Sequence, residues 1–177
     1  MIIEYGSIIK DVKWVWPTEE IFNNWKEDFF KIDETEKFDI YLVGGFLEKI
    51  NGRKNHTSDI DIILTKNGDD LYSIEKLIYE GTKLGIEKYN VFFDILWFED
   101  LPIYANMKPG DLKKTKLYII SDKWIVDGEV NKQYKNIKQI SDNLWEMESV
   151  FPSNKQKKLI NEGFIYSNPL KLNNKNG

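Results

Sequence analysis

The chain has no cysteine, only one histidine, His56, and only one arginine, Arg53, among its 177 residues. The absence of cysteine excludes disulfides, thiolate metal sites and cysteine nucleophiles. A single histidine excludes sites that need two imidazoles, so any metal site must use oxygen ligands. The longest apolar runs fall far short of the ~20 residues that cross a bilayer, and Met1–Gly6 lacks the basic start of a secretion signal. We therefore expect a soluble, cytoplasmic protein with no membrane partner.

The length suits one domain, or one domain with an appendage. The net charge of −4 is unevenly distributed, because residues 38–102 carry 7 basic and 12 acidic side chains whereas residues 103–177 carry 13 and 8. An acidic region with a basic flank is typical of a cation-assisted site that receives phosphate, although an ordinary solvated surface explains the same charges. We expect a first domain over residues 1–130 and a basic helical extension over residues 131–177.

The hydrophobic pattern predicts strands that alternate with helices. Strands are expected over residues 12–16, 38–43, 59–65, 89–98, 116–121 and 124–126. Helices are expected over residues 19–32, 46–50, 69–84, 135–149 and 156–162, the first capped by Thr18 and the third ended by Gly85. This order favours an α/β or α+β domain with a mixed sheet flanked by helices and a small helical C-terminal portion.

Three aspartates form the main candidate site. Asp59 and Asp61 are two residues apart on an expected strand, so both side chains point to the same face of the sheet. Asp94 interrupts a later strand that is otherwise apolar, where a charge is costly unless it is paired or bound to a cation. If the two strands are neighbours, three carboxylates converge. Such oxygen ligands suit Mg²⁺, which is held by carboxylates, substrate phosphates and water.

A glycine pair precedes the aspartates. Gly44 and Gly45 stand at the end of one expected strand and before a short helix. Glycines let the backbone approach a ligand closely, and a helix N-terminus favours negative charge, so this turn suits a triphosphate. The glycines and the aspartates together favour phosphoryl or nucleotidyl transfer.

These residues resemble the signature of the nucleotidyltransferase superfamily of DNA polymerase β. The runs Leu42–Phe46 (LVGGF) and Ser58–Ile62 (SDIDI) match its glycine turn and its Asp-hydrophobic-Asp strand, and Asp94 matches a third carboxylate on a later strand. The resemblance covers residues 38–98. It implies a polymerase β-like fold and transfer of NMP from an NTP to a hydroxyl acceptor by two metal ions, Mg²⁺ or Mn²⁺.

The resemblance also implies a role for each aspartate. Asp59 and Asp61 would ligate the metals, and Asp94 would ligate the catalytic metal and help to deprotonate the acceptor hydroxyl. Arg53 would reach the triphosphate as a bidentate donor, and Ser58 would bond a phosphate oxygen or cap the strand entry.

The acceptor stays open at this stage. The run Gly44–Arg53 is similar to the head of CCA-adding enzymes and poly(A) polymerases, which favours an RNA or tRNA 3′ end, but Glu48-Lys49 replaces their usual Arg-Asp. Small antibiotic nucleotidyltransferases and the minimal enzymes of toxin–antitoxin systems share parts of the pattern, which leaves a small molecule or a protein as the alternative acceptor. A catalytically inactive module that binds nucleotide or RNA is a further alternative.

Other residues carry weaker signals. His56 in its polar loop is more typical of a surface residue than of a base, and the six tryptophans are more typical of core than of nucleobase stacking. The lysines at 113, 114 and 116 and at 155, 157 and 158 suit either a phosphate backbone or a solvated surface.

Overall fold

The computed structural model describes residues 2–5, 8–101, 103, 113–119, 134–141, 144–151 and 153–173. Its strands are β1 Ile2–Tyr5, β2 Ile8–Asp11, β3 Asp39–Val43, β4 Asp59–Thr65, β5 Phe92–Phe98, β6 Lys113–Ile119, β7 Tyr134–Gln139, β8 Trp145–Phe151 and β9 Leu170–Lys171. Its helices are α1 Glu19–Phe29, α2 Gly44–Ile50, α3 Leu71–Leu84 and α5 Asn154–Asn161, with a 3₁₀ turn η1 at Asp33–Lys37 and a π turn η2 at Gly85–Tyr89.

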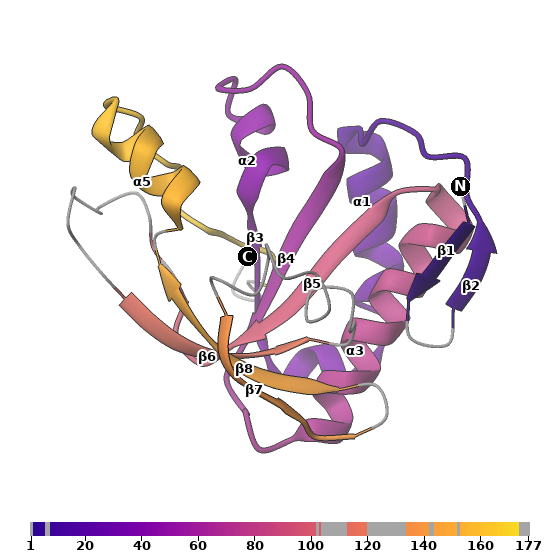
Figure 1. Ribbon diagram of the computed structural model, residues 1–177. Coiled ribbons are helices and arrows are strands. Elements are labelled where there is room, and N and C mark those ends of the chain that lie inside the picture. Colours follow the sequence, from indigo (N-terminus) through magenta and orange to yellow (C-terminus); the bar gives the residue numbers. More distant parts are fainter. Residues whose placement is uncertain are drawn as a thin grey trace.

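Seven strands form one mixed sheet in the order β7-β8-β6-β5-β4-β3-β9, while β1 and β2 form a separate hairpin. Strands β4 and β5 run parallel, and α3 lies between them in the sequence as the crossover helix that a parallel pair requires. The other neighbours in the sheet are antiparallel. Figure 1 shows α2 at the edge of the sheet where β3 ends and β4 begins, apart from α1 and α3. The expected mixture of helices and a mixed sheet is confirmed.

Local signals explain the two long helices. The Thr18 hydroxyl accepts a hydrogen bond from the Ile21 backbone N–H at 3.1 Å, so this residue caps α1 as expected. The Asp70 carboxylate accepts from the Ser73 backbone N–H at 3.2 Å and caps α3 in the same way. Among the described residues, no helix combines the length and the apolar composition that a membrane span needs.

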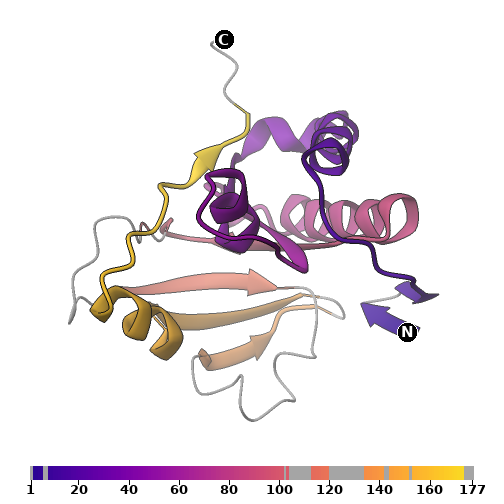
Figure 2. The same cartoon turned by 90° about the horizontal axis from the view of Figure 1, so that it is seen from above.

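The larger core lies between the sheet and the pair α1 and α3, which share one side of the sheet in Figure 2. Trp25 of α1 is fully buried, with its ring stacked on Phe29 at 4.5 Å and on Phe93 at 4.1 Å between centroids. Its indole Nε1–H donates to the Gly81 carbonyl of α3 at 2.9 Å. Trp25 therefore joins both helices to β5.

A smaller core lies on the other side of the sheet. There, Ile63 of β4, Phe98 of β5 and Met147 of β8 form a buried cluster. Because strand side chains alternate between faces, Ile63 lies on the same face as Asp59 and Asp61. The strands that carry the aspartates are thus held from both sides.

The helix expected over residues 135–149 is wrong, because this region forms β7 and β8. The spacing of Ile137, Ile140, Leu144 and Met147 fits a helix, but β8 pairs with β6 along its whole length, which satisfies the backbone of both strands. Asn136 has a positive φ of 55° and lies at an irregularity of β7, a geometry that no helix allows. The seven-stranded sheet therefore continues beyond residue 130, and the expected helix over residues 156–162 is observed as α5.

Three smaller expectations also differ from the structure or fall outside it. Residues 12–16 follow β2 without forming a strand themselves. Gly85 is the C-cap of α3, which ends at Leu84 as expected, but the chain continues beyond it through the π turn η2 and leaves the helical path only at Asn90, whose φ of 55° is left-handed. The strand expected over residues 124–126 lies outside the described residues.

We predict that Trp25→Phe lowers the free energy of unfolding by about 1–3 kcal/mol, because it removes buried ring area and the indole hydrogen bond to the Gly81 carbonyl, which keeps only the Gly85 backbone N–H as a donor. Urea unfolding monitored by circular dichroism measures the change. Trp16→Phe is the matched control, because Trp16 is 64% exposed and the same replacement there should cost less than about 0.5 kcal/mol. Equal losses in the two variants would contradict this account of the core.

Candidate active site

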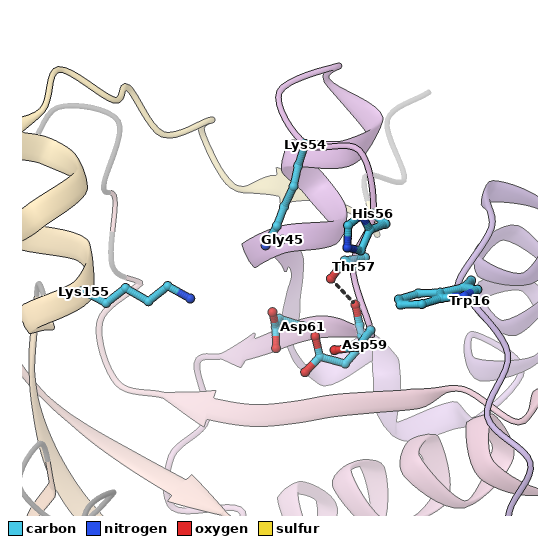
Figure 3. Close-up of a pocket in the computed structure, with 9 residues that line it drawn as sticks. Trp16, Gly45, Lys54, His56, Thr57, Asp59, Asp61 and Lys155 are labelled. Atoms are coloured by element: carbon cyan, nitrogen blue, oxygen red, sulfur yellow. Dashed lines mark hydrogen bonds between the residues drawn. The ribbon is translucent and has the colours of Figure 1, made fainter.

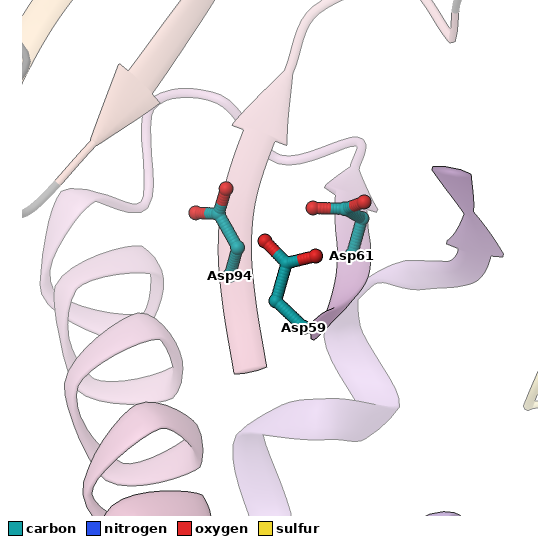
Figure 4. A group of neighbouring side chains, drawn as sticks. All are labelled: Asp59, Asp61 and Asp94. Atoms are coloured by element: carbon teal, nitrogen blue, oxygen red, sulfur yellow. The ribbon is translucent and has the colours of Figure 1, made fainter. Parts of the chain in front are cut away.

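Strand pairing brings the three predicted aspartates together. Asp61 of β4 lies directly opposite Asp94 of the parallel strand β5, and Asp59 precedes it on the same face of β4. Each of the three offers an oxygen atom such that all three atoms lie within 4.8 Å of one another. Figure 4 shows the three carboxyl groups pointing toward a common space. The predicted convergence of the carboxylates is confirmed.

Side chains alternate between the two faces of β4 and β5, so the aspartates lie on one face and the apolar core lies on the other. Ile60 and Ile62 are fully buried against the helices, whereas Asp59 and Asp61 are half-buried on the opposite face. Asp94 likewise stands between two residues of the larger core but points away from them. The site lies where both parallel strands begin and where β3 ends.

The glycine pair packs directly against Asp61. Gly44 has a φ of +76°, and a Cβ atom there would lie 2.1 Å from the Asp61 Oδ2 atom. Only glycine fits such a position without strain or collision. The Gly45 backbone N–H donates to the Asp61 carboxylate. This hydrogen bond lowers the pKa of Asp61, although burial and the neighbouring carboxylates outweigh it. The glycines therefore let the first turn of α2 approach a carboxylate closely, and any ligand bound there would meet this backbone.

Burial raises the pKa of all three aspartates, and neighbouring carboxylates raise it further for Asp61 and Asp94. Burial, followed by the charges of Asp94 and Asp59, holds the pKa of Asp61 well above its ordinary value. Burial and the Asp59 charge raise the pKa of Asp94 to about 7. Burial also raises the pKa of Asp59, although the nearby Lys54 ammonium opposes this shift. Three carboxylates that resist ionisation together form a site whose charge a bound cation would offset.

A cavity of about 530 Å³ opens beside Asp59 and Asp61. Its other lining residues come from four separate segments: Trp16, Gly45, the loop residues Lys54, His56, Thr57 and Ser58, and Lys155 of α5. In Figure 3, Lys155 extends from α5 toward Asp61 on one side, and Trp16 stands beyond Asp59 on the other. The cavity thus has a cationic end and an aromatic end with the carboxylates between them.

The structure places the predicted accessory residues differently. Ser58 is exposed and lines the cavity. Arg53 is not among the described residues that line it; its guanidinium donates to the Ile165 carbonyl and lies 4.0 Å from the buried Glu48 carboxylate. Glu48 also accepts from the backbone N–H and hydroxyl of Ser167 at 2.8 and 3.1 Å. In this structure Arg53 joins α2 to the C-terminal segment.

Sequence reasoning missed Lys54 and Thr57. The Lys54 ammonium lies above Gly45, since a Cβ atom built there would be 3.1 Å from the Lys54 Nζ atom. The buried Thr57 hydroxyl donates to the Asp59 carbonyl at 3.2 Å and shapes the entry into β4. The signal in the sequence that could have identified both residues is their position in the loop between Gly45 and Asp59.

The sequence left two roles open for the tryptophans, core packing or base stacking, and two for the lysines, phosphate contact or a solvated surface. Trp25 and Trp97 are buried core residues, whereas Trp16 is exposed and lines the cavity. Lys155 lines the cavity as well. The side chains of residues 113–119 lie outside the described part of the chain. One tryptophan and one lysine of these sets are therefore placed where a ligand would meet them.

No protein-family model matches this chain, and no curated protein or solved structure matches it significantly.

The donor set fits a hard divalent cation. Three carboxylates within 4.8 Å supply only oxygen atoms, which Mg²⁺ and Mn²⁺ accept. The Lys54 ammonium lowers the pKa of Asp59 and of Asp61, but burial outweighs this effect in both. The arrangement can therefore hold one or more such ions and bring a phosphate group to them.

We predict that Gly44→Ala abolishes stabilisation of the protein by Mn²⁺, because the added Cβ atom displaces the Asp61 carboxylate. Thermal unfolding with and without Mn²⁺ measures this effect. Gly52→Ala is a close control, since Gly52 has a φ of +75° but nothing within 4 Å of the added Cβ atom. Both variants should lose about 1 kcal/mol of stability from backbone strain, and Gly44→Ala should lose more. Retention of the Mn²⁺ response in Gly44→Ala would contradict the site.

The pKa of Asp94 predicts how the stability of the metal-free protein depends on pH. Because this pKa is about 7 in the folded protein and 3.8 ordinarily, the folded state binds the proton more tightly than the unfolded chain. Stability should therefore fall as pH rises from about 4 to 7. Asp94→Asn removes this loss, so its free energy of unfolding should exceed that of wild type by on the order of 1–3 kcal/mol at pH 8, with a smaller gap near pH 5.

Urea unfolding in EDTA at several pH values measures this difference. The comparison between the two proteins at each pH cancels the titration of groups that they share. If the gap instead widens toward acid pH, the assigned direction of the Asp94 shift is wrong.

Proposed function

We propose that this protein is a nucleotidyltransferase that transfers NMP from an NTP to a hydroxyl acceptor. The observation that supports the proposal best is the convergence of Asp59, Asp61 and Asp94 beside the Gly44-Gly45 turn. The three carboxylates would hold Mg²⁺ or Mn²⁺, which when bound polarises the phosphate and offsets the charge of the leaving pyrophosphate. The polymerase β-like fold named from the sequence is part of this proposal.

The cavity supplies positive charge for the triphosphate. Lys54 lies above Gly45, and Lys155 faces Asp61 from the opposite wall. A triphosphate carries about four negative charges near neutral pH, so phosphate groups require cations from the protein as well as metal. We assign the phosphate contacts to Lys54, Lys155 and Ser58 rather than to Arg53, because Arg53 is held by Ile165 and Glu48.

In the proposed reaction the oxygen of the acceptor hydroxyl forms a bond to the α-phosphorus of the NTP. The bond between that phosphorus and the bridging oxygen of pyrophosphate breaks, and pyrophosphate leaves. Asp94, which lies opposite Asp61 on the neighbouring strand, accepts the hydroxyl proton as the general base. With a cation bound, Asp59 and Asp61 on the neighbouring strand would be ionised ligands that orient the reacting groups.

An anionic acceptor such as the 3′ end of RNA or tRNA fits the basic helix at the cavity. Lys155 and Lys158 are three residues apart on α5, so their side chains lie on the same side of the helix. A phosphate backbone that enters along this side would reach the carboxylates past Lys155. A small molecule or a protein is the alternative acceptor, and an inactive nucleotide- or RNA-binding module is the alternative function.

We predict that Asp61→Asn lowers transfer of labelled NMP by at least about 100-fold, because the trio loses a ligand at its centre. The assay combines each labelled NTP and Mg²⁺ or Mn²⁺ with separate pools of RNA, small molecules bearing hydroxyl groups, and lysate proteins. Asp69→Asn is the control, since Asp69 is an exposed residue outside the cavity lining. The pool that receives Asp61-dependent label identifies the acceptor class.

Two other outcomes would overturn the proposal in different ways. If NTP and Mn²⁺ stabilise the protein through Asp61 but no pool is labelled, the chain is a binding module. If neither metal nor NTP changes its stability, the acidic trio is not a ligand site.

A further inference from the structure

Trp16 occupies an unusual position for so large an apolar side chain. Its residue is 64% exposed, yet it lines the same cavity as Asp59 and Asp61. Four other tryptophan positions with described side chains, 14, 25, 97 and 145, are buried or half-buried. An exposed indole at the wall of a polar cavity offers a flat apolar surface to whatever enters that cavity.

The backbone on both sides of Trp16 is held in place. The Val15 N–H donates to the Asn90 carbonyl at 3.1 Å, and the Lys49 ammonium of α2 donates to the Pro17 carbonyl at 3.0 Å. Further back, Val12 is buried in the larger core and Trp14 packs against it. The indole is therefore presented by a fixed stretch of chain, which reduces the entropy lost when a ligand stacks on it.

His56 completes this end of the cavity. Its ring lies 5.3 Å from the Trp16 ring with an interplanar angle of 81°, an edge-to-face contact. His56 comes from the loop that leads into β4, so the contact joins the segment before α1 to the loop beside the carboxylates. The two rings, which come from separate parts of the sequence, meet at the rim of the cavity (Figure 3).

The order of groups along the cavity gives a bound nucleotide a direction. Lys155 lies at one end, the carboxylates lie in the middle, and Trp16 with His56 lies at the other end. A nucleotide has the same division, with anionic phosphates at one end and a planar heterocycle at the other. The volume of about 530 Å³ lies in the range of small-molecule sites.

We propose that Trp16 is the stacking platform for the nucleobase of the NTP, an inference that rests on the proposed function. The phosphates then extend from the carboxylates toward Lys54 and Lys155. Stacking engages the face of the ring, which every base has, so this contact supplies affinity with little discrimination among the four bases. The platform would add affinity for the base, while the described cavity lining offers lysines and no arginine for the phosphates.

The test compares nucleotides with inorganic tripolyphosphate, which carries the phosphates but no base. Calorimetric titration in Mn²⁺ measures the affinity of each NTP and of tripolyphosphate for wild type, Trp16→Ala and Trp16→Phe. We expect Trp16→Ala to weaken NTP binding about 10-fold and Trp16→Phe to stay within about 3-fold of wild type. Binding of tripolyphosphate should be the same in all three proteins.

Tyr72→Ala is the matched control for loss of an exposed aromatic ring, because Tyr72 is 74% exposed and does not line the cavity. It should leave both affinities unchanged. Equal weakening of NTP and tripolyphosphate by Trp16→Ala would mean a structural role and would overturn the inference, as would a wild-type protein that binds tripolyphosphate as tightly as NTP.

Both of those results leave the proposed transfer reaction standing if Asp61-dependent labelling is observed. By contrast, a wild-type protein that binds neither NTP nor tripolyphosphate in Mn²⁺ overturns the proposed function and the stacking platform together.

Discussion

The parallel pairing of β4 with β5 is the constraint on which the site depends. Its register puts Asp61 opposite Asp94, so like charges face each other across neighbouring strands, where they repel. The Gly45 N–H and the Lys54 ammonium offset only part of this repulsion. A protein keeps such an arrangement at a cost in stability, and clusters of this kind are typical of functional sites. The proposed metal site gives this cost a reason.

One face of the sheet carries the larger core, and the other face carries the candidate site. On one face, α1 and α3 cover an apolar core around Trp25. An unpaired charge in this core would be costly. On the other face, the same strands present the aspartates, followed by Ile63 in the smaller core. Because the alternation of a strand separates its two faces, one seven-residue segment such as β4 can serve both purposes. The three carboxylates are thus held by strands of the sheet and not by loops.

Segments far from the aspartates in the sequence complete the cavity. Trp16 precedes α1, and Lys155 belongs to a helix near the other end of the chain. The C-terminal segment is tied to α2 through Glu48, which bonds Ser167, and through Arg53, which bonds the Ile165 carbonyl. The lone arginine of the chain therefore joins the C-terminal segment to α2, the helix that carries Gly45 of the cavity lining, although its residue type suggested a phosphate ligand.

The sequence by itself determined the elements around the aspartates: the cap of α1, the strands β3 and β4, the glycine turn and the shared face of Asp59 and Asp61. Each depends on local rules of capping, alternation and backbone freedom, which act over a few residues. Only the tertiary structure decided that residues 134–151 form strands, because an apolar spacing that fits a helix yielded to pairing with β6. Likewise, only folding could bring Trp16, Lys54 and Lys155 to one cavity, since contacts between distant residues leave no periodic trace in the chain.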